Sequence, residues 1–247
     1  MIKDIFSSIS VYGKAINLIT THNLWRFVII PGLVSVAVML LLALGPGMYF
    51  ANSDLDATLA GMIPWEWLQP VAEIIADSLV FMLTLLLIFF VGKYIILIVA
   101  SPFMGALSEK VEAIVTGRTV PSDSNFVQDL VRGIRISLRN LIREIFLTLL
   151  FLLFNLVPVI GSLIGAILTF AVEAYYAGFG NMDYTLERKR YNVSQSVQFV
   201  SENRGVAMGN GVVFLGLLLI PVIGWFLAPA FATVAATVMC LEKLKQA

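Results

Sequence analysis

The chain has very little of what most catalytic and metal sites are built from. Its 247 residues include one cysteine, Cys240, and one histidine, His22. A single cysteine excludes a disulfide within the chain, and one histidine leaves no cluster of ligands for a structural metal. No GxxxxGKS or GxxxxGKT sequence for holding nucleotide phosphates occurs either. We therefore predict neither a metal nor another cofactor, and we expect a protein that is not an enzyme.

Charged residues are also scarce, and the two signs cancel. They make up 13% of the chain, with 16 basic and 16 acidic residues, whereas soluble domains carry roughly 25%. Net charge therefore indicates no nucleic-acid partner. Hydrophobic residues reach 59% and the mean hydropathy is +0.92. These values predict an all-α integral membrane protein with a single transmembrane domain over 1–247.

Residues 1–20 lack both a continuous apolar core and a cleavage site of small residues, so we predict that they are not a removable signal peptide. Apolar residues recur there at helical spacing, which is typical of an amphipathic helix. They are Ile2, Ile5, Phe6, Ile9, Tyr12, Ile16 and Ile19. Two interpretations stay open: the apolar face lies in the membrane surface, or it packs against the rest of the protein.

Two long apolar runs follow. Residues 24–50 predict a first transmembrane helix, and residues 69–116 predict a longer second one with a kink at Pro102. Lys93 lies inside the second run, where an ionisable residue indicates a functional site, with Glu173 as its candidate partner. The alternative is that Lys93 extends to an interface. All basic residues apart from Lys93 can lie on one side of the membrane, which predicts that both termini are cytoplasmic.

Residues 125–142 predict an amphipathic helix with a basic face. Its apolar stripe consists of Phe126, Leu130, Ile134, Leu138, Leu141 and Ile145. Arg132, Arg135, Arg139 and Arg143 fall on one narrow face, at intervals of three and four residues. Such a face at the cytoplasmic surface orients the protein and contacts anionic lipid, or it concentrates anions near a pore entrance.

A five-residue sequence occurs twice, as VPVIG at Val157–Gly161 and as IPVIG at Ile220–Gly224. Each copy interrupts a long apolar stretch, and the arm before the first copy would be about 20 Å long as a helix, too short for a hydrocarbon core of about 30 Å. We therefore predict two re-entrant hairpins, residues 143–182 and 207–242, separated by a cytoplasmic helix at 193–204. The alternative is two hairpins of full spans. The predicted turn residues are Pro158, Gly161, Pro221 and Gly224.

Several local sequences resemble the CysZ family of bacterial sulfate permeases, within a wider group that includes the etoposide-induced membrane proteins. They are LWRFVIIPGLV, ASPFMGALSEKVEAIVTG, VPVIG, NMDYTLERKRYNV and LLIPVIGWFLAPAFATVAATVMCLE, in the same order along nearly the whole chain. The resemblance implies two long transmembrane helices with two half-penetrating hairpins. It also implies a homo-oligomer in the bacterial inner membrane that takes up sulfate, or a related oxyanion, for cysteine synthesis.

The same resemblance implies where the anion binds. Members hold sulfate near the start of the first span with a Gly-Leu-Arg-Arg type motif, which corresponds here to Asn23, Leu24, Trp25 and Arg26. Free N–H groups at a helix N-terminus and a guanidinium suit an oxyanion. This chain keeps one arginine of the two, and the alternative for Arg26 is an anchor at the cytoplasmic interface. Glu109 and Glu112 correspond to acidic residues of the family, and together with Lys93 and Glu173 they form the candidate permeation path. The alternative for Glu109 and Glu112, which we favour, is a structural role in which they hold the cytoplasmic end of the second helix together.

A function of another class is a non-conducting protein that shapes or scaffolds the membrane. Hairpins and amphipathic helices inserted from one side would act as a wedge in one leaflet, and the basic face of 125–142 would contact membrane lipids. A measurement of whether the purified protein changes solute flux in vesicles, or changes their shape instead, separates the transport hypothesis from the membrane-shaping one.

Overall fold

In the computed structural model, residues 2–51, 68–117, 126–157 and 159–245 are described, and these residues form helices and no strand. The α-helices are α1 (Ile2–Thr21), α2 (Arg26–Ala51), α4 (Gln69–Thr116), α5 (Phe126–Leu152), α6 (Ile160–Arg188), α7 (Val193–Glu202), α8 (Arg204–Leu218) and α9 (Ile223–Leu244), with a 3-10 helix η2 (Leu153–Leu156) before α6. They divide into two compact units. One contains Met1–Val36 and Ile96–Ala247, and the other Ala37–Ile95.

The chain is a multi-pass membrane protein. Three helical segments are long and apolar enough to cross a bilayer: Gly92–Thr116, Ile160–Arg188 and Ile223–Leu244. A fourth candidate is the pair Ile2–Thr21 and Arg26–Leu42, whose two helices are bent by 113° at the break between them. By length and hydropathy α6 and α9 can cross completely, so the half-penetrating depth of the hairpins stays a prediction.

The core of the larger unit is the crossing of α6 and α8. A Cβ atom on Gly178 would lie 1.8 Å from the Ala207 carbonyl oxygen, and one on Gly211 would lie 1.7 Å from that of Ala174. Each helix thus presents an Ala-x-x-x-Gly pair to the other. Small residues at this spacing let two membrane helices approach closely. The polar centre of the crossing is Asn210, whose amide accepts a 2.9 Å hydrogen bond from Asn181 and donates one to the Ala232 carbonyl of α9.

Helix α1 packs against α8 and α9 through one of its faces. Its buried residues are Ser8, Val11, Tyr12, Ala15 and Ile19. The Tyr12 hydroxyl donates to the Asn210 carbonyl at 2.9 Å, and the Ser8 hydroxyl donates to the Val206 carbonyl at 3.1 Å. Of the seven residues on the apolar face predicted for 1–20, only Tyr12 and Ile19 belong to this buried face, so packing on the protein holds for those two residues. Ile2, Phe6 and Ile16 lie on the remaining surface of α1 and are exposed.

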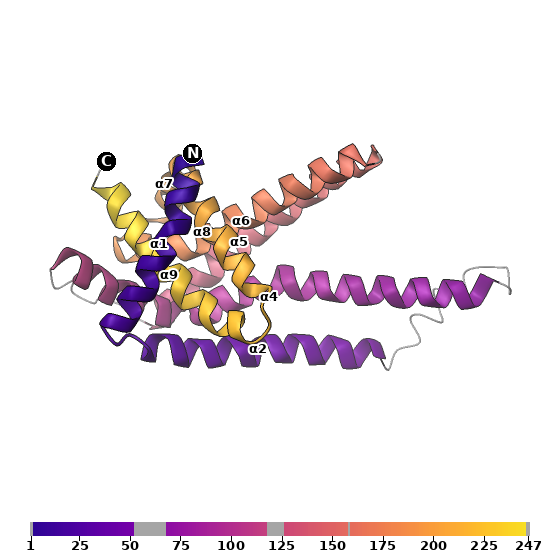
Figure 1. Ribbon diagram of the computed structural model, residues 1–247, viewed down its shortest axis with the longest axis horizontal. Coiled ribbons are helices and arrows are strands. Elements are labelled where there is room, and N and C mark those ends of the chain that lie inside the picture. The colour runs from indigo at the N-terminus through magenta and orange to yellow at the C-terminus, as the bar shows by residue number, and fades with distance from the viewer. Residues whose placement is uncertain (1, 52–67, 118–125, 158, 246–247) are drawn as a thin grey trace. The chain divides into compact units, whose positions relative to one another are not determined.

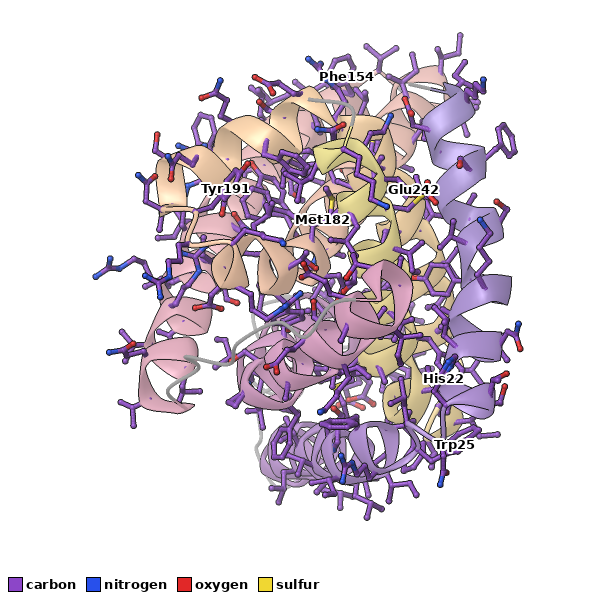
Figure 2. The ribbon with its side chains drawn as sticks, turned by 90° about the vertical axis from the view of Figure 1, so that its left-hand side faces the viewer. His22, Trp25, Phe154, Met182, Tyr191 and Glu242 are labelled. Carbon is purple, nitrogen blue, oxygen red and sulfur yellow. The ribbon has the colours of Figure 1, made fainter. Side chains whose placement is uncertain are left out.

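Helices α5 and α6 form one hairpin, and α8 and α9 form another (Figure 1), as the contacts within each pair show. We call them hairpin 1 and hairpin 2. Helix α5 continues unbroken from Phe126 to Leu152. From the sequence we predicted a surface helix over 125–142 and a separate hairpin arm that begins at residue 143. In the structure both segments belong to α5. Phe154, labelled in Figure 2, lies at the turn of hairpin 1.

The two repeated sequences form the same turn. Val159 has φ 64° and ψ −70°, and Val222 has φ 63° and ψ −63°. These are values that β-branched residues rarely adopt. Gly161 donates its N–H to the Val157 carbonyl at 3.0 Å, and Gly224 donates to the Ile220 carbonyl at 2.9 Å. The repeated pattern therefore predicts the helix reversals correctly, although Pro158 lies outside the described residues.

Helix α4 runs through Pro102 without ending. Proline has no N–H for the carbonyl four residues earlier, here that of Ile98. The Ser101 hydroxyl donates a 2.8 Å hydrogen bond to this carbonyl in its place. Ser101 therefore compensates for the bond that Pro102 removes, and the helix continues to Thr116.

Candidate functional site

The corner between α1 and α2 contains the four residues for which the sequence predicts anion binding. Asn23 has φ 51°, in the left-handed region. Leu24 donates its N–H to the Ile19 carbonyl at 2.9 Å, and Asn23 donates to the Thr20 carbonyl at 3.4 Å. This is the hydrogen-bond pattern of a Schellman C-cap, with the buried Leu24 and Ile19 as its hydrophobic contact. Asn23 thus has a structural role, and asparagine can fill a position that suits glycine because it tolerates this conformation.

Trp25 and Arg26 occupy the outer side of this corner. Figure 2 labels Trp25 beside His22, where α1 ends and α2 begins. Both Trp25 and Arg26 are exposed, and the Arg26 guanidinium carbon lies 4.9 Å from the centre of the Phe27 ring. Phe27 and Val28 donate their N–H groups to the Leu24 and Trp25 carbonyls at 3.0 and 2.9 Å, which leaves the Arg26 N–H at the N-terminus of α2, the positive end of the helix dipole. The corner therefore combines an exposed guanidinium with a helix N-terminus, a combination that suits an oxyanion.

Glu112 is the centre of a buried ion-pair cluster. Its carboxylate accepts a 2.8 Å hydrogen bond from Arg188 and forms a second ion pair with Lys189. The same Arg188 nitrogen donates to the Ser108 hydroxyl at 2.9 Å. This pairing joins the C-terminal ends of α4 and α6, which is the structural role that the sequence favoured for Glu112. Glu109, three residues earlier on α4, is half-buried.

Three hydroxyl groups continue this cluster into the protein. The oxygens of Ser108, Thr185 and Thr237 lie between 2.9 and 3.1 Å from one another, and all three side chains are fully buried. They come from α4, α6 and α9 respectively. A buried group of this kind is stable because each hydroxyl has a partner. The cluster thus fixes these three helices relative to one another.

The arginines of the predicted basic face of α5 differ in their surroundings: some bond to other helices, and others are exposed on the surface. Arg132 donates to Asp183 at 2.9 Å, to Ser196 at 3.0 Å and to the Tyr191 carbonyl at 2.8 Å. This side chain holds α5 against α6 and α7. Arg135 and Arg143, in contrast, are exposed.

Arg139 is half-buried and lies between these extremes. It donates to the Asn140 side chain at 2.8 Å, and its guanidinium carbon lies 5.7 Å from the centre of the Phe179 ring. An arginine stays charged at neutral pH.

Lys93 and Glu173 belong to different compact units. Lys93 is fully buried, with its ammonium nitrogen 5.0 Å from the centre of the Tyr94 ring. Glu173 is buried in α6. The burial of both residues agrees with their place in apolar runs, and their pairing stays a prediction.

No group of three or more His, Cys, Asp or Glu side chains that could hold a metal ion occurs in the described part of the chain. Cys240 is buried.

The model of the family described as Sulfate transporter CysZ/Etoposide-induced protein 2.4 matches residues 11–229. The chain belongs to this family. A relative in Vibrio cholerae serotype O1, named Sulfate transporter CysZ, is 26% identical over 245 residues, which cover 97% of this chain and 94% of that protein. A relative of the same name in Salmonella typhimurium is 25% identical over 244 residues, covering 96% of this chain and 92% of that protein.

The CysZ/Etoposide-induced protein 2.4 family match extends over the corner between α1 and α2, hairpin 1 and the turn of hairpin 2. The resemblance drawn from five short sequences is therefore confirmed. In this family member, the sequence-based predictions missed the partners that give several charged residues their positions. Asp183, Arg188 and Lys189 all lie in the NMDYTLERKRYNV sequence. The signal for Arg188 was its spacing from Asn181 and Thr185, which places these polar residues on one face of α6, whereas Asp183 lies on another side of the helix.

Proposed function

We propose that this chain is a sulfate transporter of the bacterial inner membrane, acting as a permease or channel that supplies sulfate for cysteine synthesis. The observation that carries the proposal is the match to relatives named Sulfate transporter CysZ over 97% and 96% of this chain. A match of that extent includes every helix of the described structure. Both termini lie in the cytoplasm under this proposal, and the protein works as a homo-oligomer among membrane lipids.

Entry of the anion is assigned to the corner formed by Asn23, Leu24, Trp25 and Arg26. Arg26 supplies the charge, the paired guanidinium donors and its own N–H, and the N-terminus of α2 supplies the positive end of the helix dipole. Asn23 keeps the turn that presents them, because it holds the left-handed conformation at the end of α1. The loss of the first arginine of the family motif, whose place Trp25 takes, weakens the site without removing its geometry.

The hairpins penetrate part of the bilayer in this proposal. Helix α8 has 15 residues and is therefore about 22 Å long, less than the hydrocarbon core of about 30 Å. A Cβ atom on Gly32 of α2 would lie 2.7 Å from the Phe226 ring, so hairpin 2 near its turn touches α2 six residues after Arg26. Six residues of helix are about 9 Å. If Arg26 lies at the cytoplasmic interface, the turn of hairpin 2 lies within the half of the membrane nearer the cytoplasm.

The test is uptake of radiolabelled sulfate into proteoliposomes containing equal amounts of the wild type, Arg26→Ala or Arg204→Ala. Arg204 is an exposed arginine at the start of α8, so its removal controls for loss of charge. We expect uptake by the wild type and by Arg204→Ala, and at least about a tenfold loss for Arg26→Ala, because one charged hydrogen-bond donor contributes about 1.5–3 kcal/mol. Wild-type uptake equal to that of empty vesicles would contradict the transporter proposal.

One observation favours the second candidate function, a protein that shapes the membrane without conducting. The turn of hairpin 1 carries large apolar side chains on its surface, with Leu156 81% and Val159 82% exposed. A wedge in one leaflet needs such a surface. Tubulation or fragmentation of vesicles by the protein, in the absence of any sulfate flux, would favour this candidate over transport.

A further inference from the structure

Helix α5 buries several polar residues and exposes most of its apolar ones, although Arg135 and Arg143 are also exposed and Ile136 is buried. Val131, Ile134, Leu138, Ile142, Ile145 and Leu149 are between 44% and 60% exposed. Ser137, Asn140 and Glu144 are 6%, 1% and 0% exposed. An amphipathic helix at the surface of a soluble protein has the opposite arrangement. From Leu138 onward the exposed apolar side of α5 therefore suits hydrocarbon, and the side with Asn140 and Glu144 is buried and polar.

Polar residues on the inward side of α5 form a continuous line along the helix, with Ser137, Asn140 and Glu144 buried and Thr148 half-buried. Ser137, Asn140, Glu144 and Thr148 follow one another at intervals of three or four residues, which places them on one side. We call these four residues the inner polar line. Helix α5 packs on α6, and Arg139 is near Phe179. At the end of the line nearer the start of α5, Gly133 packs against Ser101 of α4, since a Cβ atom on Gly133 would lie 2.8 Å from the Ser101 oxygen.

Two polar atoms on the inner polar line are buried and have no hydrogen-bond partner, the Asn140 Nδ2 and the Thr148 Oγ1. They are eight residues apart, or about 12 Å along the helix. The Asn140 Oδ1 accepts a 2.8 Å hydrogen bond from Arg139, and this bond fixes which end of the amide carries the unused N–H groups. Buried polar atoms of folded proteins nearly always have partners, and where the protein supplies none the partner is water or a ligand.

We infer that the inner polar line faces a hydrated route along hairpin 1, and that the transported oxyanion passes along it. The inference rests on the proposed transport function. The groups left to solvate an ion there are donors, namely the Asn140 amide and the Thr148 hydroxyl, because Glu144 is engaged within the protein. Arg139 places a positive charge next to Asn140. Neutral and positive donors replace part of the hydration shell of an anion, as anion-selective pores require.

Thiol labelling tests this inference without measuring transport. Cysteine is introduced on the inner polar line as Ser137→Cys, Asn140→Cys and Thr148→Cys, and on the outer side as Ile142→Cys and Leu149→Cys. The wild type, whose Cys240 is buried, gives the background. Each variant in proteoliposomes is treated with a membrane-impermeant methanethiosulfonate that carries either a sulfonate or a trimethylammonium group. Size-exclusion profiles identify any variant that does not fold, and Ser137→Cys changes the side chain least.

We expect the three inner positions to react at least about tenfold faster than Ile142→Cys and Leu149→Cys, because a thiol in hydrocarbon stays protonated and only the thiolate reacts. The sulfonate reagent should react faster than the cationic one at Asn140→Cys and Thr148→Cys, and sulfate should slow both reactions severalfold. Equal or faster reaction at the outer positions would overturn the inference. So would inner positions that react without any preference for the anionic reagent and without any effect of sulfate.

The outcomes for transport and for the route are separable. If the wild type takes up no sulfate, the proposed function fails, whatever the labelling pattern is. If the wild type takes up sulfate while the inner positions stay unreactive in folded variants, transport holds and the route lies elsewhere.

Discussion

The Leu217 carbonyl oxygen lies 1.7 Å from the place where a Cβ atom on Gly224 would be. The Phe154 carbonyl oxygen lies in the same way against Gly161, at 1.9 Å. In both hairpins the glycine follows the carbonyl by seven residues, so the returning helix begins in direct contact with the last part of the arriving one. A side chain at either glycine would separate the two arms. This contact explains why glycine ends both VPVIG-type sequences.

We predict that Gly224→Ala destabilises the protein. The added methyl group must displace the Leu217 carbonyl or the start of α9, and overpacking of this kind costs about 1–3 kcal/mol. Thermal unfolding in detergent measures the effect. The matched control is Gly216→Ala, because Gly216 lies in α8 with nothing within 4 Å of its added Cβ atom. In a helix this control should be neutral or stabilising by up to about 1 kcal/mol. Equal unfolding midpoints for Gly224→Ala and Gly216→Ala would show that the close contact between Gly224 and the Leu217 carbonyl is not needed for stability.

We predict that position 23 tolerates glycine but not valine. Asn23 has φ 51°, which glycine adopts without strain and a β-branched residue does not. Asn23→Gly should therefore keep both stability and sulfate uptake, whereas Asn23→Val should lower the unfolding midpoint. Uptake lost in Asn23→Gly at unchanged stability would instead assign the Asn23 side chain to anion binding.

The sequence predicted the two helix reversals well because their cause is local. A proline, a glycine and the length of the apolar arms are sufficient to indicate a turn, and the structure has one at both places. The depth of the hairpins in the bilayer is not local, since α6 and α9 are long enough to cross it. That property depends on where the membrane lies around the whole protein.

The direction of the α5 faces could not be predicted from its pattern. The sequence gives an apolar stripe containing Leu138 and a polar face containing Asn140, but a helical pattern does not say whether the surrounding medium is water or lipid. In water Leu138 would be buried. In this structure Leu138 is 53% exposed and Asn140 is 1% exposed. The partners of Arg132 were missed for a related reason, because ion pairs between α5 and α6 join residues about fifty positions apart.

We predict that Arg132 and Arg135 differ sharply in their effect on stability, although they are three residues apart on α5. Arg132 bonds to Asp183, which is 5% exposed, whereas Arg135 is exposed. Arg132→Gln leaves a buried carboxylate without its main partner, and loss of one member of a buried pair costs about 3–5 kcal/mol. Arg135→Gln should change stability by less than about 0.5 kcal/mol. Thermal unfolding of both variants at one detergent concentration compares them, and equal midpoints would contradict the structural role of Arg132.

We predict that the Glu112 carboxylate stabilises the fold because it neutralises the buried charge of Arg188. A double variant tests whether this charge is the cause. The Arg188 side chain is 10% exposed, while that of Lys189 is 36% exposed and can turn to solvent. Glu112→Gln should therefore lower the unfolding midpoint by leaving the Arg188 charge buried without its carboxylate. Adding Arg188→Met removes that charge and keeps much of the side-chain volume, so the double variant should recover most of the loss. The Glu109→Gln variant, at a half-buried position one turn earlier, is the control. A double variant less stable than Glu112→Gln alone would mean that Arg188 stabilises the fold mainly through Ser108 and the hydroxyl cluster.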